Sequence, residues 1–272
     1  MKEGASKKVI KRLERIGQCG IWISIAPLKL SGTNLSFDEW MDSSRQRYGL
    51  KPLGLCNQCD GCNAAFTVVH ALSCTKGGLV SIRHNDARDE AGALAGQALH
   101  ASKISYEPMI NNGRGPSVQH GQTTAGTGNQ AGQEARGDVL VHGLWETGSG
   151  CVLDICISDT DARSYADKTS KRVLEDHAKR KKAKYLQPCL DRRRSFAPLI
   201  YSVDGMACKE ARAFEKRIAS LLAEKWNRPY SKLVGYVRGR MAMNILRSNT
   251  VCLRGGARTE ADGAVGGRRP RI

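Results

Sequence analysis

Residues 138–157, DVLVHGLWETGSGCVLDICI, are the stretch of sequence that decides the fold. Two apolar, β-branched runs at 138–142 and 152–157 are typical of strands. The residues between them at 146–150, ETGSG, have the composition of a turn. The stretch therefore predicts a β-hairpin at the centre of the chain.

Helical and strand-like segments flank this hairpin. Residues 20–30 are apolar and β-branched enough for a strand, and 33–36 have the composition of a helix cap before Phe37, Trp40 and Met41. Apolar spacing predicts further helices at 86–102, 170–190, 209–226 and 230–248, and a further strand at 197–203. The fold class predicted from this order is α/β, with a compact core.

Changes in composition divide the chain into segments. A Gly-, Gln- and Thr-rich stretch at 111–135 has almost no apolar residues, so we expect a disordered insertion there. The predicted organisation is a basic linker region with one strand and one helix at 1–55, a zinc-binding module at 56–78, an α/β domain at 79–253 and a disordered basic tail at 254–272.

Asp154 is a carboxylate in the middle of an apolar strand, where an unpaired charge is costly. Asp138 begins the preceding strand of the predicted hairpin, so the two carboxylates are expected to meet at one end of the sheet. Two facing carboxylates repel each other, and a divalent cation relieves that repulsion. The alternative is structural: Asp138 starts a strand, and Asp154 forms a salt bridge.

A lysine-rich run on the predicted helix after Asp154 offers a cation to this site. Lys181 and Lys184 are three residues apart and share a helix face, and Tyr185 follows Lys181 by one turn. An ammonium beside a scissile phosphate can stabilise the charge of the transition state. The alternative is a solvated basic face that contacts phosphates.

The sequence Cys59-x2-Cys62-x7-His70-x3-Cys74 has the ligand types and spacing of a structural zinc site. Two thiolates two residues apart hold one side of the ion, and a His and a Cys four apart on a helical turn close the other. Cys56 forms a second Cys-x2-Cys pair with Cys59, so five side chains compete for four positions. We expect Cys56 to be the one left out.

The formal net charge of +17 and the sequence pI of about 9.7 favour a polyanionic partner, for which nucleic acid is the leading expectation. The scattered cysteines lack the density of a small secreted disulfide scaffold and favour a reducing compartment. No apolar run approaches the ~20 residues of a membrane span, so no membrane association is expected.

Taken in order, these motifs resemble the C-terminal region of early-branching non-LTR retrotransposon proteins, in which a zinc knuckle precedes a restriction-like endonuclease. The resemblance extends over about 20–253. The segments that carry it are the Cys59–Cys74 cluster, 77–85 (GGLVSIRHN), 136–138 (RGD), 153–156 (LDIC), 181–185 (KKAKY) and 198–205 (PLIYSVDG). Gly137 stands where the family has a proline.

The resemblance implies a PD-(D/E)xK fold, a mixed sheet flanked by helices that holds a catalytic magnesium ion. It implies that Asp138 and Asp154 bind the magnesium and that Lys181 is the catalytic lysine, supported by Lys184 and Tyr185. An assisting acid is expected among Asp86, Asp89 and Glu90. The expected nucleic-acid contacts are Arg83, His84, Lys171, Arg172, Lys179, Arg180, Lys182, Arg192, Arg193 and Arg194.

The leading expectation is a magnesium-dependent DNA endonuclease that nicks target DNA to prime reverse transcription, with element RNA as a further partner. No Tyr/Phe-x-Asp-Asp polymerase centre is present in the sequence. A nuclear location follows from the expected substrate. Two alternatives remain: a DNA- or RNA-binding remnant whose nuclease site has decayed, and a zinc-stabilised protein-interaction domain.

Overall fold

The computed structural model describes residues 7–111 and 135–255. Its helices are α1 (Lys7–Ile16), α2 (Ile21–Ser24), α3 (Phe37–Arg47), α4 (Val68–Ala71), α5 (Leu79–Ala98), α6 (Ser170–Leu190), α7 (Lys209–Trp226) and α8 (Tyr230–Arg254), with 3-10 turns η1 (Lys29–Ser31), η2 (Ala101–Lys103) and η3 (Arg163–Tyr165). Its strands are β1 (Ile104–Tyr106), β2 (Met109–Asn111), β3 (Ala135–Arg136), β4 (Val139–His142), β5 (Gly150–Ser158) and β6 (Arg194–Ser202).

A four-stranded sheet with the order β1-β4-β5-β6 forms the centre of the molecule. The predicted hairpin is confirmed: β4 and β5 pair antiparallel, with Val139 opposite Leu153. The strands β5 and β6 pair parallel, because α6 carries the chain from one end of the sheet back to the other. The short strands β2 and β3 form a separate antiparallel pair.

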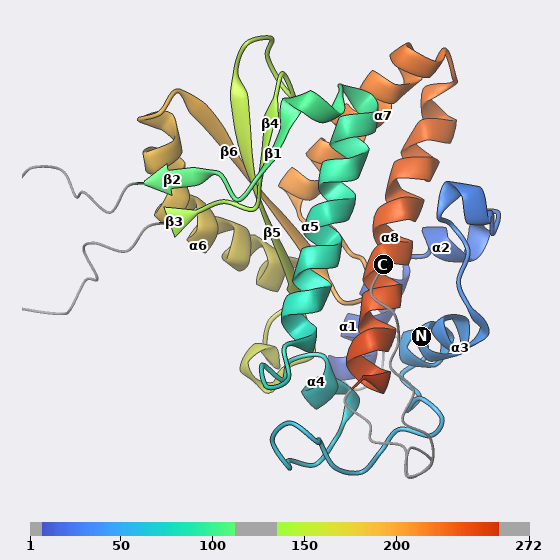
Figure 1. Cartoon of the computed structure of the whole chain (residues 1–272). Helices are drawn as coiled ribbons and strands as arrows, with labels where there is room; N and C mark the ends of the chain where they lie inside the picture. The colour runs from blue at the N-terminus through green and yellow to red at the C-terminus, as the bar shows by residue number, and fades with distance from the viewer. Residues whose placement is uncertain (1–6, 112–134, 256–272) are drawn as a thin grey trace, which may run out of the picture.

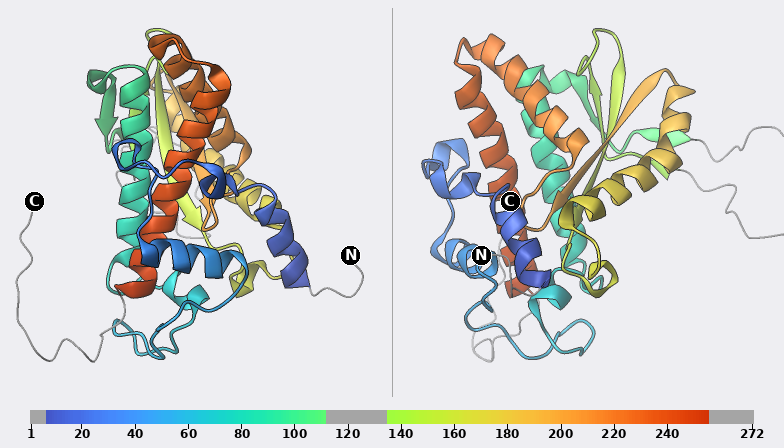
Figure 2. Two further views of the ribbon diagram at one scale, coloured as in Figure 1. Left: turned by 90° about the vertical axis from the view of Figure 1, so that its right-hand side faces the viewer. Right: turned by 180° about the vertical axis from the view of Figure 1, so that it is seen from behind.

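The sheet lies between α5 on one face and α6 on the other, and α7 and α8 extend the α5 side (Figures 1 and 2). Leu153 and Ile155 of β5 join the core with Leu94 of α5 and Phe214 of α7. The predicted α/β class, with a mixed sheet flanked by helices, is therefore confirmed. None of the described helices has the length and apolar character needed to cross a membrane.

The strand predicted at 20–30 is wrong. The chain forms the single helical turn α2 there, followed by η1. A short apolar run suits a strand or a buried helical turn equally, and in the part of the chain that the structure describes this segment joins neither sheet. Instead, Trp22 packs against Ala242, Met243 and Leu246 of α8.

Two predicted helices have different bounds from those expected, and one of them, expected at 230–248, continues to Arg254. The helix expected at 86–102 starts earlier, at Leu79, directly after Gly78 in a left-handed conformation, and it ends at Ala98. The helix predicted after residues 33–36 is confirmed as α3, and Ser36 caps it in a reciprocal pair of hydrogen bonds with Glu39. Of the insertion expected at 111–135, residue 111 belongs to β2 and residue 135 belongs to β3, and 112–134 lie outside the described residues. Almost all of the tail expected at 254–272 also lies outside them.

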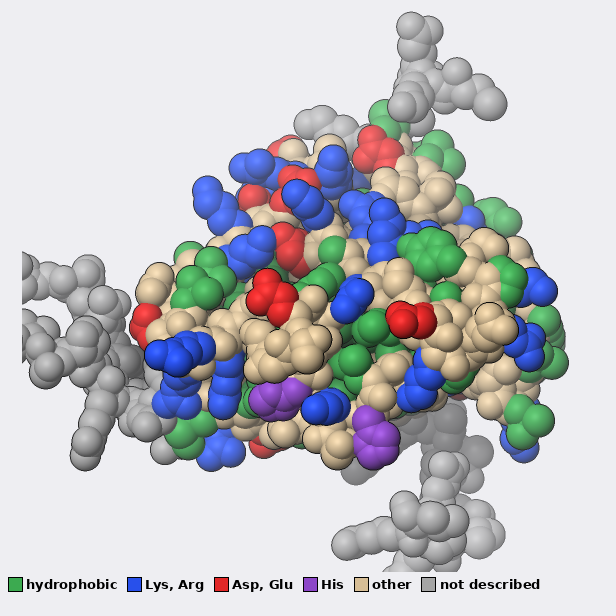
Figure 3. Space-filling model, turned by 90° about the horizontal axis from the view of Figure 1, so that it is seen from above, with side chains coloured by type: hydrophobic (Ala, Val, Ile, Leu, Met, Phe, Trp, Pro, Cys, Tyr) green, Lys and Arg blue, Asp and Glu red, His purple; other side chains and the backbone are tan. Residues whose placement is uncertain are grey.

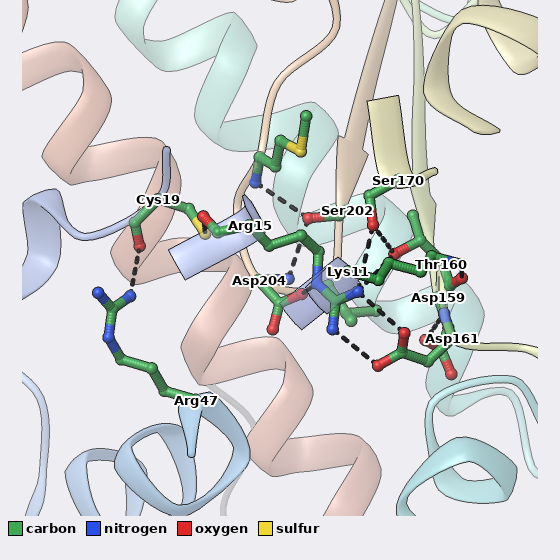
Figure 4. A network of polar contacts seen from close by, with 12 residues as sticks. Lys11, Arg15, Cys19, Arg47, Asp159, Thr160, Asp161, Ser170, Ser202 and Asp204 are labelled. Atoms are coloured by element: carbon green, nitrogen blue, oxygen red, sulfur yellow. Dashed lines mark hydrogen bonds and ion pairs between the residues drawn. The ribbon is translucent and has the colours of Figure 1, made fainter. Parts of the chain in front are cut away.

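The helix α1 is tied to the sheet by Arg15, whose side chain is 4% exposed. Its guanidinium donates to Thr160 and Ser170 at 3.2 Å, pairs with Asp161 at 2.7 Å and forms a further ion pair with Asp204 (Figure 4). These partners follow β5, begin α6 and follow β6. Arg15 therefore fixes the two parallel strands and the start of α6 relative to one another.

Arg15→Ala should lower the free energy of unfolding by about 3–5 kcal/mol, because it leaves two carboxylates of a buried network without their counter-charge. Urea denaturation monitored by circular dichroism measures the loss. Arg163→Ala, at an exposed position of η3, is the matched control and should change little. Equal stability of the two variants would contradict this role for Arg15.

Glu215 of α7 is a buried carboxyl, 5% exposed, that accepts a hydrogen bond from the Tyr201 hydroxyl at 3.1 Å. Burial raises its pKa to about 7, although Tyr201 and Arg238 lower it. The folded protein thus holds this proton more tightly than the unfolded chain, whose glutamates have a pKa of about 4.3.

A carboxyl with a raised pKa in the folded state stabilises the protein at low pH, and this contribution is lost as the pH rises through about 7. When the pH is raised from 5 to 8, the deprotonation of Glu215 should lower the unfolding free energy of the wild type by about 2–3 kcal/mol. Urea denaturation at both pH values measures the change. Glu215→Gln should remove this part of the pH dependence, and an unchanged dependence in that variant would contradict the assignment.

Candidate functional site

Asp138 lies at the point where β4 begins and its ladder with β5 ends. Its Oδ2 accepts a hydrogen bond from the backbone N–H of Ile155 at 2.5 Å, in place of a further strand residue. Its Oδ1 lies 3.1 Å from Nε2 of His84 on α5. The carboxylate is therefore held beside Asp154, the residue before Ile155, by contacts from both the sheet and a helix.

Asp154 faces α6 and pairs with Lys181. The Lys181 Nζ lies 2.9 Å from Oδ2 and 3.2 Å from Oδ1 of the carboxylate. The aspartate side chain is 6% exposed and that of the lysine 33%. The buried Oδ2 accepts no hydrogen bond of good geometry. The structure thus pairs Asp154 with Lys181 and bonds Asp138 to the N–H of Ile155, the residue after Asp154. That the two carboxylates share one cation stays a prediction.

Burial and neighbouring charges shift the pKa values of both Asp154 and Lys181. Burial raises the pKa of Asp154, and the nearby Asp138 carboxylate raises it further, whereas Lys181 lowers it. For Lys181, burial lowers the pKa, but the Asp154 charge outweighs burial and the net shift is upward. Because Asp154 is the more buried partner, its carboxylate bears most of the desolvation cost. An additional cation at this position would relieve that cost.

Lys184 and Tyr185 lie next to Lys181 but do not reach the carboxylates through any contact recorded among the described residues. The Tyr185 ring has the Lys184 Nζ at 4.9 Å and the Lys181 Nζ at 5.7 Å from its centroid. Its other neighbour is Phe196 of β6, at 5.8 Å between ring centroids. Tyr185 thus packs α6 onto the sheet and offers Lys181 an aromatic surface.

The three acids considered on α5 have other partners. Asp86 accepts from Ser248 at 2.8 Å, Asp89 pairs with Arg88 at 2.9 Å, and Glu90 pairs with Arg240 at 2.8 Å. The α5 side chain that contacts Asp138 is His84, whose pKa is raised chiefly by that hydrogen bond. The sequence pointed to His84 only as a nucleic-acid contact, because 54 residues separate it from Asp138.

Gly137 is required by a close approach of the two strands. A Cβ at this position would lie 2.3 Å from Cγ1 of Val152, far inside van der Waals contact. The absence of a side chain before Asp138 therefore allows the start of β4 to lie against β5.

A second polar cluster lies farther along the contact between β5 and α6. His177, one turn before Lys181, has its Nδ1 2.8 Å from the Ser158 hydroxyl and its Nε2 2.9 Å from the Tyr165 hydroxyl. No sequence pattern marks this cluster, because its members come from a strand, a helix and a 3-10 turn. Both imidazole nitrogens are engaged, so the cluster fixes α6 next to the Asp154–Lys181 pair.

The second candidate site is the predicted zinc cluster. The ligand atoms of Cys59, Cys62, His70 and Cys74 all lie within 4.8 Å of one another, and no other group of three or more such residues in the described ranges meets this condition. The structure therefore supports the expected set, without Cys56.

The distances in this cluster suit a tetrahedral zinc ion. Cys59 and Cys74 sulfurs lie 4.0 Å apart, Cys62 and Cys74 sulfurs 3.9 Å, and the Cys62 sulfur lies 3.3 Å from Nε2 of His70. Zinc–sulfur bonds of about 2.3 Å in a tetrahedron place sulfurs ~3.8 Å apart. A hydrogen bond with His70 lowers the pKa of the Cys59 thiol to about 7, which favours the thiolate that binds metal.

Local structure positions these ligands. Thr67 caps α4 by accepting from the backbone N–H of His70 at 3.1 Å, and the Cys74 N–H donates to the His70 carbonyl at 2.7 Å. The module packs through Cys59 and Phe66 against Leu253 near the end of α8. The zinc cluster is therefore anchored on the core.

Arg83 differs from its expected role. Its side chain is 2% exposed and donates to the Leu72 carbonyl and to Asn249 of α8. This guanidinium holds the zinc module, α5 and α8 together and does not reach the surface.

The other basic residues expected to contact nucleic acid lie on or after α6. Lys182 pairs with Glu210, and Arg194 donates to the Met109 carbonyl, so both have structural partners. Arg192 also donates to the Met109 carbonyl. The exposed members of the set are Lys171, Arg172, Lys179, Arg180 and Arg193, together with Lys184.

No protein-family model matches the chain, and no significantly similar curated protein is found.

Proposed function

We propose that this protein is a magnesium-dependent DNA endonuclease with a restriction-like core, of the kind found in non-LTR retrotransposon proteins. The observation that carries the proposal is the buried Asp154, ion-paired with Lys181 and adjacent to Asp138. Two carboxylates and an ammonium near one end of the β4–β5 ladder are groups with which a metal-dependent enzyme can hydrolyse a phosphodiester.

The topology supports the same proposal. A helix (α5) is followed by an antiparallel strand set, a crossover helix (α6) and a parallel strand, with the sheet order β1-β4-β5-β6. The acids lie at the start of β4 and within β5, and the lysine lies on α6. This arrangement supports the proposed PD-(D/E)xK core, in which the helix after β5 would supply the lysine.

The donor set fits magnesium. Asp138 and Asp154 would supply carboxylate oxygens, the ligand type that this ion prefers. The Oδ2 of Asp154 has the Lys181 ammonium at 2.9 Å but accepts no hydrogen bond of good geometry, so it could also contact a metal ion. Magnesium, when bound, polarises the scissile phosphate and promotes formation of the attacking hydroxide. His84 orients Asp138, and Lys181 neutralises charge on the phosphate while remaining protonated because its pKa is raised.

The exposed cations of α6 would hold the phosphate backbone next to these carboxylates. The zinc cluster would act as a structural anchor for a second contact with DNA or with element RNA. A nuclear location is part of this proposal, because it follows from the proposed substrate.

A second candidate function is nucleic-acid binding without cleavage, as in a degenerate element. It is favoured by the Asp154–Lys181 ion pair itself, because Lys181 already neutralises the carboxylate without a metal ion. This alternative keeps salt-dependent binding but requires no response to magnesium.

Lys181→Met tests the proposal. Removing the ammonium while keeping the length of the side chain should slow magnesium-dependent nicking of supercoiled plasmid by about 10²-fold. Lys179→Met, at an exposed position of the same helix, is the matched control and should lose only a phosphate contact. If the wild-type protein is folded and loaded with zinc but does not nick the plasmid, the endonuclease proposal is contradicted and nucleic-acid binding without cleavage is favoured.

A further inference from the structure

The turn that joins α7 to α8 presents two aromatic side chains to solvent. Trp226 ends α7 and is 41% exposed, and Tyr230 begins α8 and is 44% exposed. Arg228 and Lys232 are exposed beside them. We call Trp226, Arg228, Tyr230 and Lys232 the α7–α8 tip. It lies at the upper end of the molecule in Figure 1, far along α5 from the zinc module.

The tip is held in one conformation. Asn227 ends α7 in the left-handed conformation, and the Arg228 N–H donates to the Ala223 carbonyl at 3.1 Å, which closes the helix end. Lys225 donates to the last carbonyls of α5, those of Gln97 and Leu99. The aromatic rings therefore need little ordering before they bind a partner.

The tip is strongly basic. Residues 226–259 contain no Asp or Glu. The four arginines of α8 all have partners: Arg238 pairs with Glu215, Arg240 with Glu90, Arg247 with backbone carbonyls, and Arg254 with Asp42. Arg228 and Lys232 form no ion pair with any described residue, so they are the cations of 226–254 that remain available for a partner.

Exposed aromatic faces interleaved with uncompensated cations are the combination that binds single-stranded nucleic acid, in which bases stack and phosphates pair with cations. Figure 3, seen from above, shows hydrophobic and basic side chains on this end of the molecule, with acidic side chains among them. We propose that the α7–α8 tip binds unpaired nucleotides, with Trp226 and Tyr230 stacking on bases and Arg228 and Lys232 contacting phosphates.

The position of the tip sets the length of strand that it would contact. Gln97, which accepts from Tyr236 next to the tip, and His84, at the candidate nuclease site, lie on the same helix about 20 Å apart at 1.5 Å per residue. At 3.4 Å per stacked base, a strand that contacts both would span about six nucleotides. The tip is thus placed to hold a strand that is separated from its complement near the cleavage site.

The test measures binding of the zinc-loaded full chain to a fluorescent oligothymidylate of about 20 nucleotides and to a duplex of equal length, without magnesium. Trp226→Ala and Tyr230→Ala should each weaken single-strand binding by about tenfold, and both should leave duplex binding unchanged. Trp226→Phe, which keeps a stacking face, should restore most of the affinity. The double variant Arg228→Ser/Lys232→Ser should reduce the salt slope by about 1.4.

Phe37→Ala and Lys209→Ser are the controls, since both side chains are exposed and lie outside the tip. Unchanged single-strand affinity in the Trp226 and Tyr230 variants, or equal loss in Phe37→Ala, would overturn the proposal. It would also be overturned if the variants lost binding to anionic vesicles and kept the oligonucleotide. None of these binding measurements requires cleavage, so the result of the test does not depend on whether the protein nicks DNA.

Discussion

Asp154→Asn is expected to abolish magnesium-dependent nicking, with a loss of at least ~10³-fold in rate. The substitution keeps the shape of the side chain but removes the charge that binds the cation, and metal-ion stabilisation of a phosphoryl transition state contributes several kcal/mol at 1.36 kcal/mol per tenfold. Nicking of supercoiled plasmid, followed over a series of magnesium concentrations, measures the effect.

The fold should survive this substitution. Lys181 loses its partner but remains 33% exposed, so its ammonium can turn toward water. Asp191→Asn, at an exposed position directly after α6, is the matched control and should nick as the wild type does. If Asp154→Asn nicked the plasmid at a rate within about threefold of the wild-type rate, the Asp154 carboxylate would not be part of the site that cleaves DNA.

Cys74→Ser is expected to release the zinc ion and to unfold the segment that carries the zinc ligands. Structural zinc contributes about 10–16 kcal/mol of apparent binding free energy in small zinc modules, and this energy is also folding energy. Zinc content by atomic absorption and the thermal unfolding curve measure both effects. The consequence should extend to α8, because Phe66 and Cys59 pack against Leu253.

Cys56→Ser is the matched control for this experiment. Cys56 lies outside the group whose ligand atoms converge, and its sulfur donates to the Gln58 carbonyl at 3.2 Å. This variant should keep one equivalent of zinc per chain. If Cys56→Ser lost zinc and Cys59→Ser retained it, the zinc ligand would be Cys56 and not Cys59.

The central hairpin and α6 could be predicted from the sequence because their signals are local. The alternation around Asp154, the ETGSG turn and the spacing of Lys181 on its helix all lie within 138–190. The same holds for the zinc cluster, whose ligands share one short segment. In these two segments adjacent residues carry the signal, and the pattern and the structure agree.

Contacts between distant segments could not be predicted. The apolar run at 20–30 was ambiguous until α8 supplied the surface that buries Trp22. Arg83 looked like a surface cation because nothing near it in sequence reveals its partners Leu72 and Asn249. The pairing of His84 with Asp138 depends on how α5 crosses the sheet, and the three-residue strand β1 is too short to leave a pattern.

The most direct measurement of the central claim is the anomalous scattering from crystals soaked in manganese, which replaces magnesium at carboxylate sites. The account predicts one manganese peak in contact with carboxylate oxygens of both Asp138 and Asp154, at about 2.2 Å from each. Density that shows Asp154 still paired with Lys181 alone, with no manganese between the two aspartates, would contradict it.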